Sequence, residues 1–397
     1  MTAENPYSVG LEVDGMYAQQ QSGTAIALDS VFSLLSHPNS IIPDIENNFY
    51  QVNMAVAWQV LFALLILVGE LIRRLVKLSQ PRIRYATEDF DLEKLSRYPI
   101  PQIKGKEKYR TTMGLKRLDQ RNWLTIDKNY MEEHKLRDSL FRNQRSKVFH
   151  CAPESHHACE ETLQVVTTYL CKRYPAMFKL DGNTVKITKT SEEFHLKDPT
   201  KAMEPLEIAA RLAMEDLSVL LENDKGEMYL AATASLFPIG WCAKDRIGYT
   251  ISQMHGPVPL WHKEVEFSVN KFLSRLSVDT PMERSSYFIQ VAAPGEPLDS
   301  ILFKPAGFSY DNTEPQPENI IVRRERQTFL RLPESGAIVF GVKTTLTYLP
   351  ELDLEELNNL AKEVRSWPDS VAKYKGRDQW GAVALGYTEA RAASKTA

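Results

Sequence analysis

An apolar run near the N-terminus, residues 52–72, reads VNMAVAWQVLFALLILVGELI. A helix of this length reaches roughly 30 Å, about the thickness of the hydrocarbon layer of a bilayer. No Lys or Arg precedes Arg73, whereas basic residues cluster in residues 73–84. This asymmetry predicts a single transmembrane helix with a cytosolic basic flank and an acidic lumenal or extracellular leader. Because the run contains Gln59 and Glu70, a buried core helix or an interfacial helix is the alternative.

The remainder of the chain shows two hydrophobic periods. Apolar residues recur at helical spacing in residues 159–173, 205–221, 261–276 and 353–364. Alternating or β-branched runs predict strands at residues 228–237, 248–254, 286–292, 320–332 and 337–349. The last two strands are joined by Pro333-Glu334-Ser335-Gly336, which is typical of a hairpin turn. Together these elements predict an α+β fold, an antiparallel sheet with helices packed on it.

These patterns divide the 397 residues into five segments. We expect a disordered leader at residues 1–50, followed by the transmembrane helix with its basic flank at residues 51–77. A linker at residues 78–104, one folded domain at residues 105–366 and a flexible tail at residues 367–397 complete the chain. The composition, with 43% hydrophobic and 25% charged residues, is that of a globular protein. A net charge of -3 argues against nucleic-acid binding, and four cysteines exclude a disulfide-built scaffold.

Sequence motifs for nucleotide, flavin or iron–sulfur binding are absent from the chain. One short run contains several residues of the kinds that bind zinc: His150, Cys151, His156, His157 and Cys159. The run lacks a paired Cys-x-x-Cys arrangement, and Ser155 is suited to cap a following helix. We therefore favour a helix approach over a zinc site.

His255 ends the predicted strand at residues 248–254 and is followed by Gly256-Pro257. A histidine held in this way is either a core residue with satisfied hydrogen bonds or a ligand, for example of haem iron.

A second unusual segment, residues 322–333, carries four arginines on a predicted strand. Alternation puts Arg324 and Arg326 on one face, and Arg323, Glu325 and Gln327 on the other. These side chains form either a solvated, ion-paired face or a clamp for the carboxylates of a ligand such as haem.

Five segments taken together resemble the haem-dependent oxidative N-demethylase family and follow the order found there. They are MGLKRLDQRNWLTIDKNY (113–130), YLCKRYPAMF (169–178), ARLAMEDLSVLL (210–221), WCAKDRIGYTISQMHGPVP (241–259) and RRERQTFLRLPESGAIVFGVKTTL (323–346). The resemblance implies a PAS-like haem-binding domain that oxidises a small methylated amine with dioxygen and releases formaldehyde. It also implies haem b as the cofactor and a separate flavin/iron–sulfur reductase fed by NADPH.

The resemblance assigns roles to particular residues. It implies His255 as the axial ligand of the iron, with Lys244 near the same pocket. Candidates for contacts to the propionates or the pocket are Arg323, Arg326 and Gln327. Candidate catalytic residues are Arg284, from an Arg-x-Asn-Trp motif, and Glu215, which either holds an ammonium substrate or is structural. The chain departs from that motif at Ser286 and Tyr287, and this changes the expected shape of the substrate pocket.

Three functions are consistent with these features. The first is a membrane-anchored, haem-dependent demethylase with its folded domain in the cytosol. The second is a PAS-like haem protein that senses gas or redox state, or carries haem, although the sequence has no recognisable signalling output domain. The third is a membrane protein that keeps the fold and has lost the haem; we place it last because His255 and the arginine-rich strand are both present.

Overall fold

The computed structural model describes residues 58–66, 68–69, 92, 102–197, 200, 203–293, 295–304 and 315–396. It divides the chain into two units, residues 1–82 and 83–397. In the first unit, residues 58–66 and 68–69 are helical. Within the described ranges, no helix combines the length and apolar character needed to cross a membrane. The transmembrane helix predicted at residues 52–72 is therefore not supported by the described residues, and the leader at residues 1–50 lies outside them.

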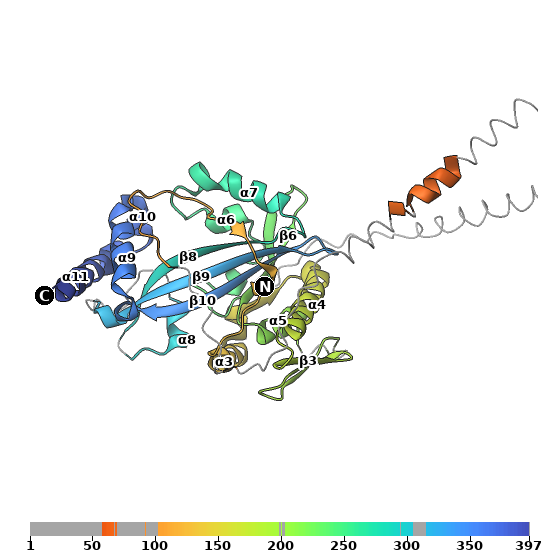
Figure 1. Ribbon diagram of the computed structural model, residues 1–397, viewed down its shortest axis with the longest axis horizontal. Coiled ribbons are helices and arrows are strands. Elements are labelled where there is room, and N and C mark those ends of the chain that lie inside the picture. The colour runs from red at the N-terminus through yellow and green to blue at the C-terminus, as the bar shows by residue number, and fades with distance from the viewer. Residues whose placement is uncertain are drawn as a thin grey trace, which may run out of the picture. The chain divides into compact units, whose positions relative to one another are not determined.

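The second unit is built on a seven-stranded antiparallel sheet in the order β1-β8-β9-β10-β6-β7-β2 (Figure 1). Its strands are β1 (Lys116–Arg117), β2 (Phe149–Cys151), β6 (Asp216–Glu222), β7 (Met228–Ala234), β8 (Met282–Val291), β9 (Ile320–Arg331) and β10 (Ile338–Tyr348). A smaller antiparallel sheet contains β3 (Phe178–Asp181), β4 (Thr184–Ile187) and β5 (Glu193–His195). The prediction of an α+β fold with antiparallel sheets is confirmed.

Helices cover both faces of the large sheet (Figure 1). On the first face, α3 (Tyr130–Val148), α4 (His156–Arg173) and α5 (Pro205–Leu212) share a hydrophobic core with β6 and β10. On the second face, α6 (Ile251–His255), the π-helical turn η5 (Trp261–Val265) and α7 (Glu266–Arg275) pack against β6, β7 and β10. The same strands contribute to two separate cores because neighbouring side chains of a strand point to opposite faces of the sheet.

The C-terminal helices form a third group. They are α9 (Leu354–Ser366), α10 (Asp369–Tyr374) and α11 (Arg377–Thr396), and they share a core with β8 and β9. The remaining helices are short: η2 (Gln120–Asn122), η3 (Pro153–Ser155), η4 (Ala243–Asp245), α8 (Leu298–Ile301), η6 (Pro317–Asn319) and η7 (Leu349–Glu351).

The flexible tail predicted at residues 367–397 is wrong, because α10 and α11 are helical and α11 carries the fully buried Trp380. The linker predicted at residues 78–104 is wrong in part. Its described residues Leu92 and Ile103 are both buried in hydrophobic cores of the folded unit.

Two secondary-structure predictions are also corrected. The helix predicted at residues 205–221 ends at Leu212, and the chain re-enters the sheet as β6 after the extended Ala213. Since β6 is buried on both faces over most of its length, its apolar run has no strand-like alternation. The strand predicted at residues 248–254 is instead the short helix α6. Thr250 and Gln253 form a capping box at its start.

Candidate functional site

The middle of the second face is one part of the large sheet whose side chains remain partly exposed. We define the second-face strip as Arg284, Ser286, Gln327, Phe340 and Val342, each of which is only partly buried. Arg284 lies opposite Gln327 across β8 and β9, and Gln327 lies opposite Val342 across β9 and β10. Inner strands of a sheet covered on both sides are normally buried throughout, so this strip is where a ligand can approach the sheet.

His255 ends helix α6. Its Nδ1 lies 2.9 Å from the carbonyl oxygen of Ile251 and donates a hydrogen bond to it, which leaves the lone pair of Nε2 available. The ring stacks on Trp261 with a centroid distance of 4.4 Å and an interplanar angle of 17°. Leu260 adopts a positive φ of 66° at the start of η5, and this turn places Trp261 against the histidine.

Burial lowers the pKa of His255, and the neighbouring cations Arg284 and Arg246 lower it further, against the hydrogen bond to Ile251. The imidazole is therefore neutral at physiological pH. A neutral ring with one nitrogen fixed by a backbone carbonyl is the form in which histidine binds a metal ion.

Arg284 lies on β8 and is close enough to His255 to affect its pKa. Its Nε is buried and has no hydrogen-bond partner among the described residues. Burial lowers the pKa of this guanidinium, opposed by the carboxylate of Glu325. The sequence therefore identified two residues, His255 and Arg284, that the structure brings close enough to influence each other electrostatically.

Arg323 is on the second face, but its donors are already used. Nε pairs with Glu325 at 2.9 Å, and the two terminal nitrogens donate to the carbonyl oxygens of Pro238 and Phe237 and to Thr344. Glu325 therefore fixes the position of the Arg323 guanidinium. With its nitrogens bound to protein atoms, Arg323 stabilises the loop after β7 and has little capacity to hold a propionate.

Gln327 retains capacity for a ligand. Its Nε2 donates to Glu325 at 3.0 Å and to Ser286 at 3.4 Å, and the side chain is partly exposed on the second-face strip. Glu325 thus accepts hydrogen bonds from both Arg323 and Gln327 and fixes their positions relative to each other.

Arg326 and Glu215 lie on the first face, away from His255. Arg326 pairs with Glu283 at 2.7 Å and donates to the backbone oxygens of Trp123 and Asn122. One oxygen of Glu215 accepts hydrogen bonds from the backbone nitrogen and the hydroxyl of Thr125, both at 3.0 Å. The sheet itself separates these two residues from the second-face strip, so the predicted site residues do not form one cluster.

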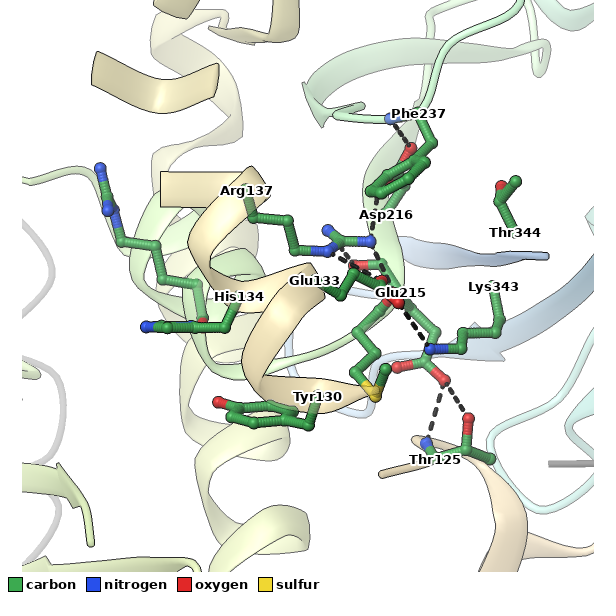
Figure 2. Close-up of polar contacts among 12 residues, drawn as sticks. Thr125, Tyr130, Glu133, His134, Arg137, Glu215, Asp216, Phe237, Lys343 and Thr344 are labelled. Atoms are coloured by element: carbon green, nitrogen blue, oxygen red, sulfur yellow. Dashed lines mark hydrogen bonds and ion pairs between the residues drawn. The ribbon is translucent and has the colours of Figure 1, made fainter. Parts of the chain in front are cut away.

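Glu215 belongs to a buried charged network between α3 and the sheet (Figure 2). Arg137 pairs with Glu133 and Asp216, both at 3.1 Å, and Lys343 pairs with Glu133 at 3.1 Å. Figure 2 shows Lys343 pointing toward both Glu133 and Glu215. Burial raises the pKa of Glu215, opposed by Lys343 and by the Thr125 donors. The network joins α3 to the start of β6 and the middle of β10, and it connects this helix to the sheet.

Two other predicted features have no support among the described residues. Lys244 is exposed in η4 and forms no hydrogen bond or ion pair there. No group of three or more His, Cys, Asp or Glu side chains in the described ranges could hold a metal ion. The run from His150 to Cys159 leads through β2 and η3 into the start of α4, so the helix that its sequence predicts is present.

A groove with a volume of about 410 Å³ lies on the first face, between α4 and the turn that joins β9 to β10. Its lining includes Trp123, Tyr169, Glu161 and Leu330, and none of the predicted site residues.

The sequence did not reveal three residues near the second-face strip. Arg246 and Trp261 adjoin His255 but belong to no metal-binding motif, although both lie close to it in sequence. Lys375 was assigned to a flexible tail. Its ammonium nitrogen lies 3.3 Å from the carbonyl oxygen of Tyr287, over the rings of Tyr287, Phe288 and Trp367.

The chain is thus an α+β protein in which helix α6 carries a neutral histidine and strand β8 carries an arginine that has no carboxylate partner among the described residues. Residues 114–385 match the family model described as haem-dependent oxidative N-demethylase, alpha subunit-like. The chain belongs to this family. The family description indicates haem dependence and oxidative chemistry, and its alpha subunit implies a partner subunit.

Proposed function

We propose that this protein is a haem-dependent oxidoreductase that removes a methyl group from a small methylated amine and releases formaldehyde. In the balanced reaction, one dioxygen, two electrons and two protons convert the methylated amine into the demethylated amine, formaldehyde and water. Haem b supplies the one-electron and dioxygen chemistry when it is bound. The observation that carries the proposal is the state of His255, which is neutral, held at Nδ1 and stacked on Trp261.

The residues present fit a haem. His255 would bind the iron through Nε2, and the Ile251 carbonyl and Trp261 would fix the orientation of the ring. The buried, unpartnered Nε of Arg284 fits an anionic group of the ligand better than Arg323 does. Phe340 and Val342 give the strip an apolar surface against which a porphyrin can pack and exclude water.

The order of the strands supports a PAS-like haem-binding domain. Five consecutive strands, β6 to β10, lie in the spatial order second, first, fifth, fourth, third. Helices α6 and α7 are inserted between the second and third of these strands, and they cover the same face of the sheet. A PAS-like domain has this order and binds its cofactor between the sheet and the inserted helices, where His255 stands.

We also propose that electrons come from a separate flavin/iron–sulfur reductase fed by NADPH. The chain has no sequence motif of its own for nucleotide, flavin or iron–sulfur binding. The implied partner subunit of the family is consistent with electron delivery by another protein.

A membrane location with the folded domain in the cytosol remains a proposal based on the charge asymmetry around residues 52–72. Apolar side chains such as Trp58, Phe62 and Leu65 are exposed on the described part of this segment. Alkaline extraction of membranes tests it: the full chain should stay in the pellet, and Leu64→Arg combined with Leu65→Arg should release it. Release of the unchanged chain would refute the anchor.

The function is tested with the full chain produced with a haem precursor. We expect a Soret band at one haem per chain, and formaldehyde release that depends on methylated amine, dioxygen and a reductant. His255→Ala should lose haem or shift the Soret band, because it removes the ligand. The matched control is His262→Ala, which removes an exposed histidine of η5 that pairs with Glu266. Unchanged haem content and spectrum in His255→Ala would refute the assignment.

A further inference from the structure

Arg284 differs from the buried arginines in its lack of a counter-ion. Five arginines of the described chain are buried, and each has a carboxylate within ion-pair distance. The pairs are Arg137–Asp216 (3.1 Å), Arg211–Glu207 (2.9 Å), Arg323–Glu325 (2.9 Å), Arg324–Glu356 (2.7 Å) and Arg326–Glu283 (2.7 Å). Arg284 has a buried Nε and no hydrogen bond or ion pair with any described residue.

The nearby acids form no ion pair with Arg284, because each accepts hydrogen bonds from other side chains. Glu325 influences Arg284, but its two oxygens accept hydrogen bonds from Arg323 and Gln327. Glu363 accepts a hydrogen bond from the hydroxyl of Tyr287 at 2.6 Å. The carboxylates around the strip are therefore committed to other partners.

Further positive charge surrounds the same position. Burial lowers the pKa of Lys375 to about 8, opposed by the carboxylate of Glu363, and the nearby cation Arg284 lowers it further. By contrast, the buried Lys343 on the first face has a carboxylate partner, Glu133, at 3.1 Å. Arg246 is a further cation near His255. The surroundings of Arg284 and His255 thus contain two further cations, Lys375 and Arg246, while Glu325 and Glu363 accept hydrogen bonds from other side chains.

We propose that Arg284 binds a carboxylate of the ligand that occupies the second-face strip. A planar guanidinium can bind a carboxylate through two parallel hydrogen bonds, and a partly buried charge without such a partner is costly. The proposal rests on the proposed function only for the source of the carboxylate. The two sources are a haem propionate and the carboxylate of an amine substrate of the N-methyl amino acid class.

The first test needs no haem. Thermal unfolding of the haem-free full chain is compared for Arg284→Met and for Arg323→Met. Because Arg284 has no hydrogen-bond or ion-pair partner among the described residues, its replacement should leave the melting temperature unchanged or raise it. Arg323→Met leaves Glu325 without its cation and should lower it. An equal drop in both variants would show that Arg284 is an ordinary structural arginine and would overturn the proposal.

The second test identifies a propionate as the source. The haem-free chain is titrated with haem b and with its dimethyl ester, in which both propionates are neutral. If Arg284 binds a propionate, the wild type prefers haem b by about ten- to hundredfold, the range for a hydrogen bond to a charged group. Arg284→Gln should abolish this preference, while Arg284→Lys, which keeps the charge, should retain part of it.

The third test identifies a substrate carboxylate as the source. N,N-Dimethylglycine and dimethylamine are added to the haem-free chain and to the haem-loaded chain. If Arg284 binds the substrate carboxylate, N,N-dimethylglycine raises the melting temperature or shifts the Soret band of the wild type but not of Arg284→Gln. Dimethylamine should act equally on both proteins.

Equal behaviour of wild type and Arg284→Gln toward haem b, its ester and N,N-dimethylglycine would overturn the proposal. The proposed function can fail separately. If the chain binds no haem, the melting temperatures of the haem-free variants and their response to N,N-dimethylglycine still decide whether Arg284 binds a carboxylate.

Discussion

Replacement of Trp380 by alanine tests whether the C-terminal helices are part of the folded unit. Trp380 on α11 is fully buried, and its ring meets that of Trp367 edge-on with centroids 6.0 Å apart. Its Nε1 donates a hydrogen bond of 3.0 Å to the carbonyl oxygen of Lys375. Large-to-small replacement of a buried tryptophan typically costs about 3–5 kcal/mol, which includes the lost transfer free energy and the cavity left behind.

We therefore expect Trp380→Ala to lower the free energy of unfolding by about 4 kcal/mol. Trp380→Phe keeps most of the apolar contact but loses the hydrogen bond to Lys375, so the expected loss is about 1–2 kcal/mol. Urea unfolding of the full chain, followed by far-UV circular dichroism, measures both losses without relying on tryptophan fluorescence.

The control is Phe267→Ala, since Phe267 is 77% exposed on α7 and its removal should change the free energy of unfolding by less than about 0.5 kcal/mol. If Trp380→Ala loses no more than this control, α11 does not contribute to the stability of the folded unit. That outcome would refute the correction of the predicted flexible tail.

Two further predictions concern buried carboxylates. Burial raises the pKa of Glu215, so the folded chain binds more protons than the unfolded chain between about pH 4.5, the ordinary pKa, and the raised value. The stability contributed by this residue therefore falls as pH rises through that window, and Glu215→Gln should gain stability relative to wild type from acid to neutral pH, with kcat unchanged. Urea unfolding across that pH range measures the difference in the free energy of unfolding between Glu215→Gln and wild type. If this difference were the same at every pH, the reasoning would be wrong. Glu161 on α4 accepts backbone hydrogen bonds of 2.8 Å from Glu334 and Ser335 at the turn between β9 and β10. Glu161→Gln should cost about 1 kcal/mol because one partly buried N–H loses its acceptor. The exposed Glu160→Gln on the same helix is the control, and equal losses would argue against a role in holding the turn.

Several elements could be predicted because their signals are local. The helix at residues 156–173 has an apolar stripe at helical spacing, and Pro175 limits its extension. The β9–β10 hairpin has two strand-like runs around a turn sequence. The alternation of a strand also placed Arg323, Glu325 and Gln327 on one face and Arg326 on the other, as the structure confirms.

Other elements could not be predicted because their patterns fit more than one structure. The run at residues 205–222 is almost continuously apolar, and such a run does not distinguish a helix from a strand buried on both faces. The short helix α6 depends on a capping box that interrupts an otherwise strand-like sequence. The position of α11 depends on Trp380 packing against Trp367 of a neighbouring segment.

In the candidate site too, the sequence shows which residue types are present, but contacts between residues distant in sequence decide how they are paired. The sequence by itself determined the chemical types present: a histidine before a Gly-Pro turn and an arginine-rich strand within motifs of one family. Only the tertiary structure decided which of these side chains has a partner. Arg326 meets Glu283, 43 residues away, and Arg323 meets the carbonyl oxygen of Phe237, 86 residues away. Such distant pairings satisfy Arg323 and Arg326, whereas no described carboxylate pairs with Arg284, because the charge balance of a buried group is set by the groups that the folded chain brings beside it.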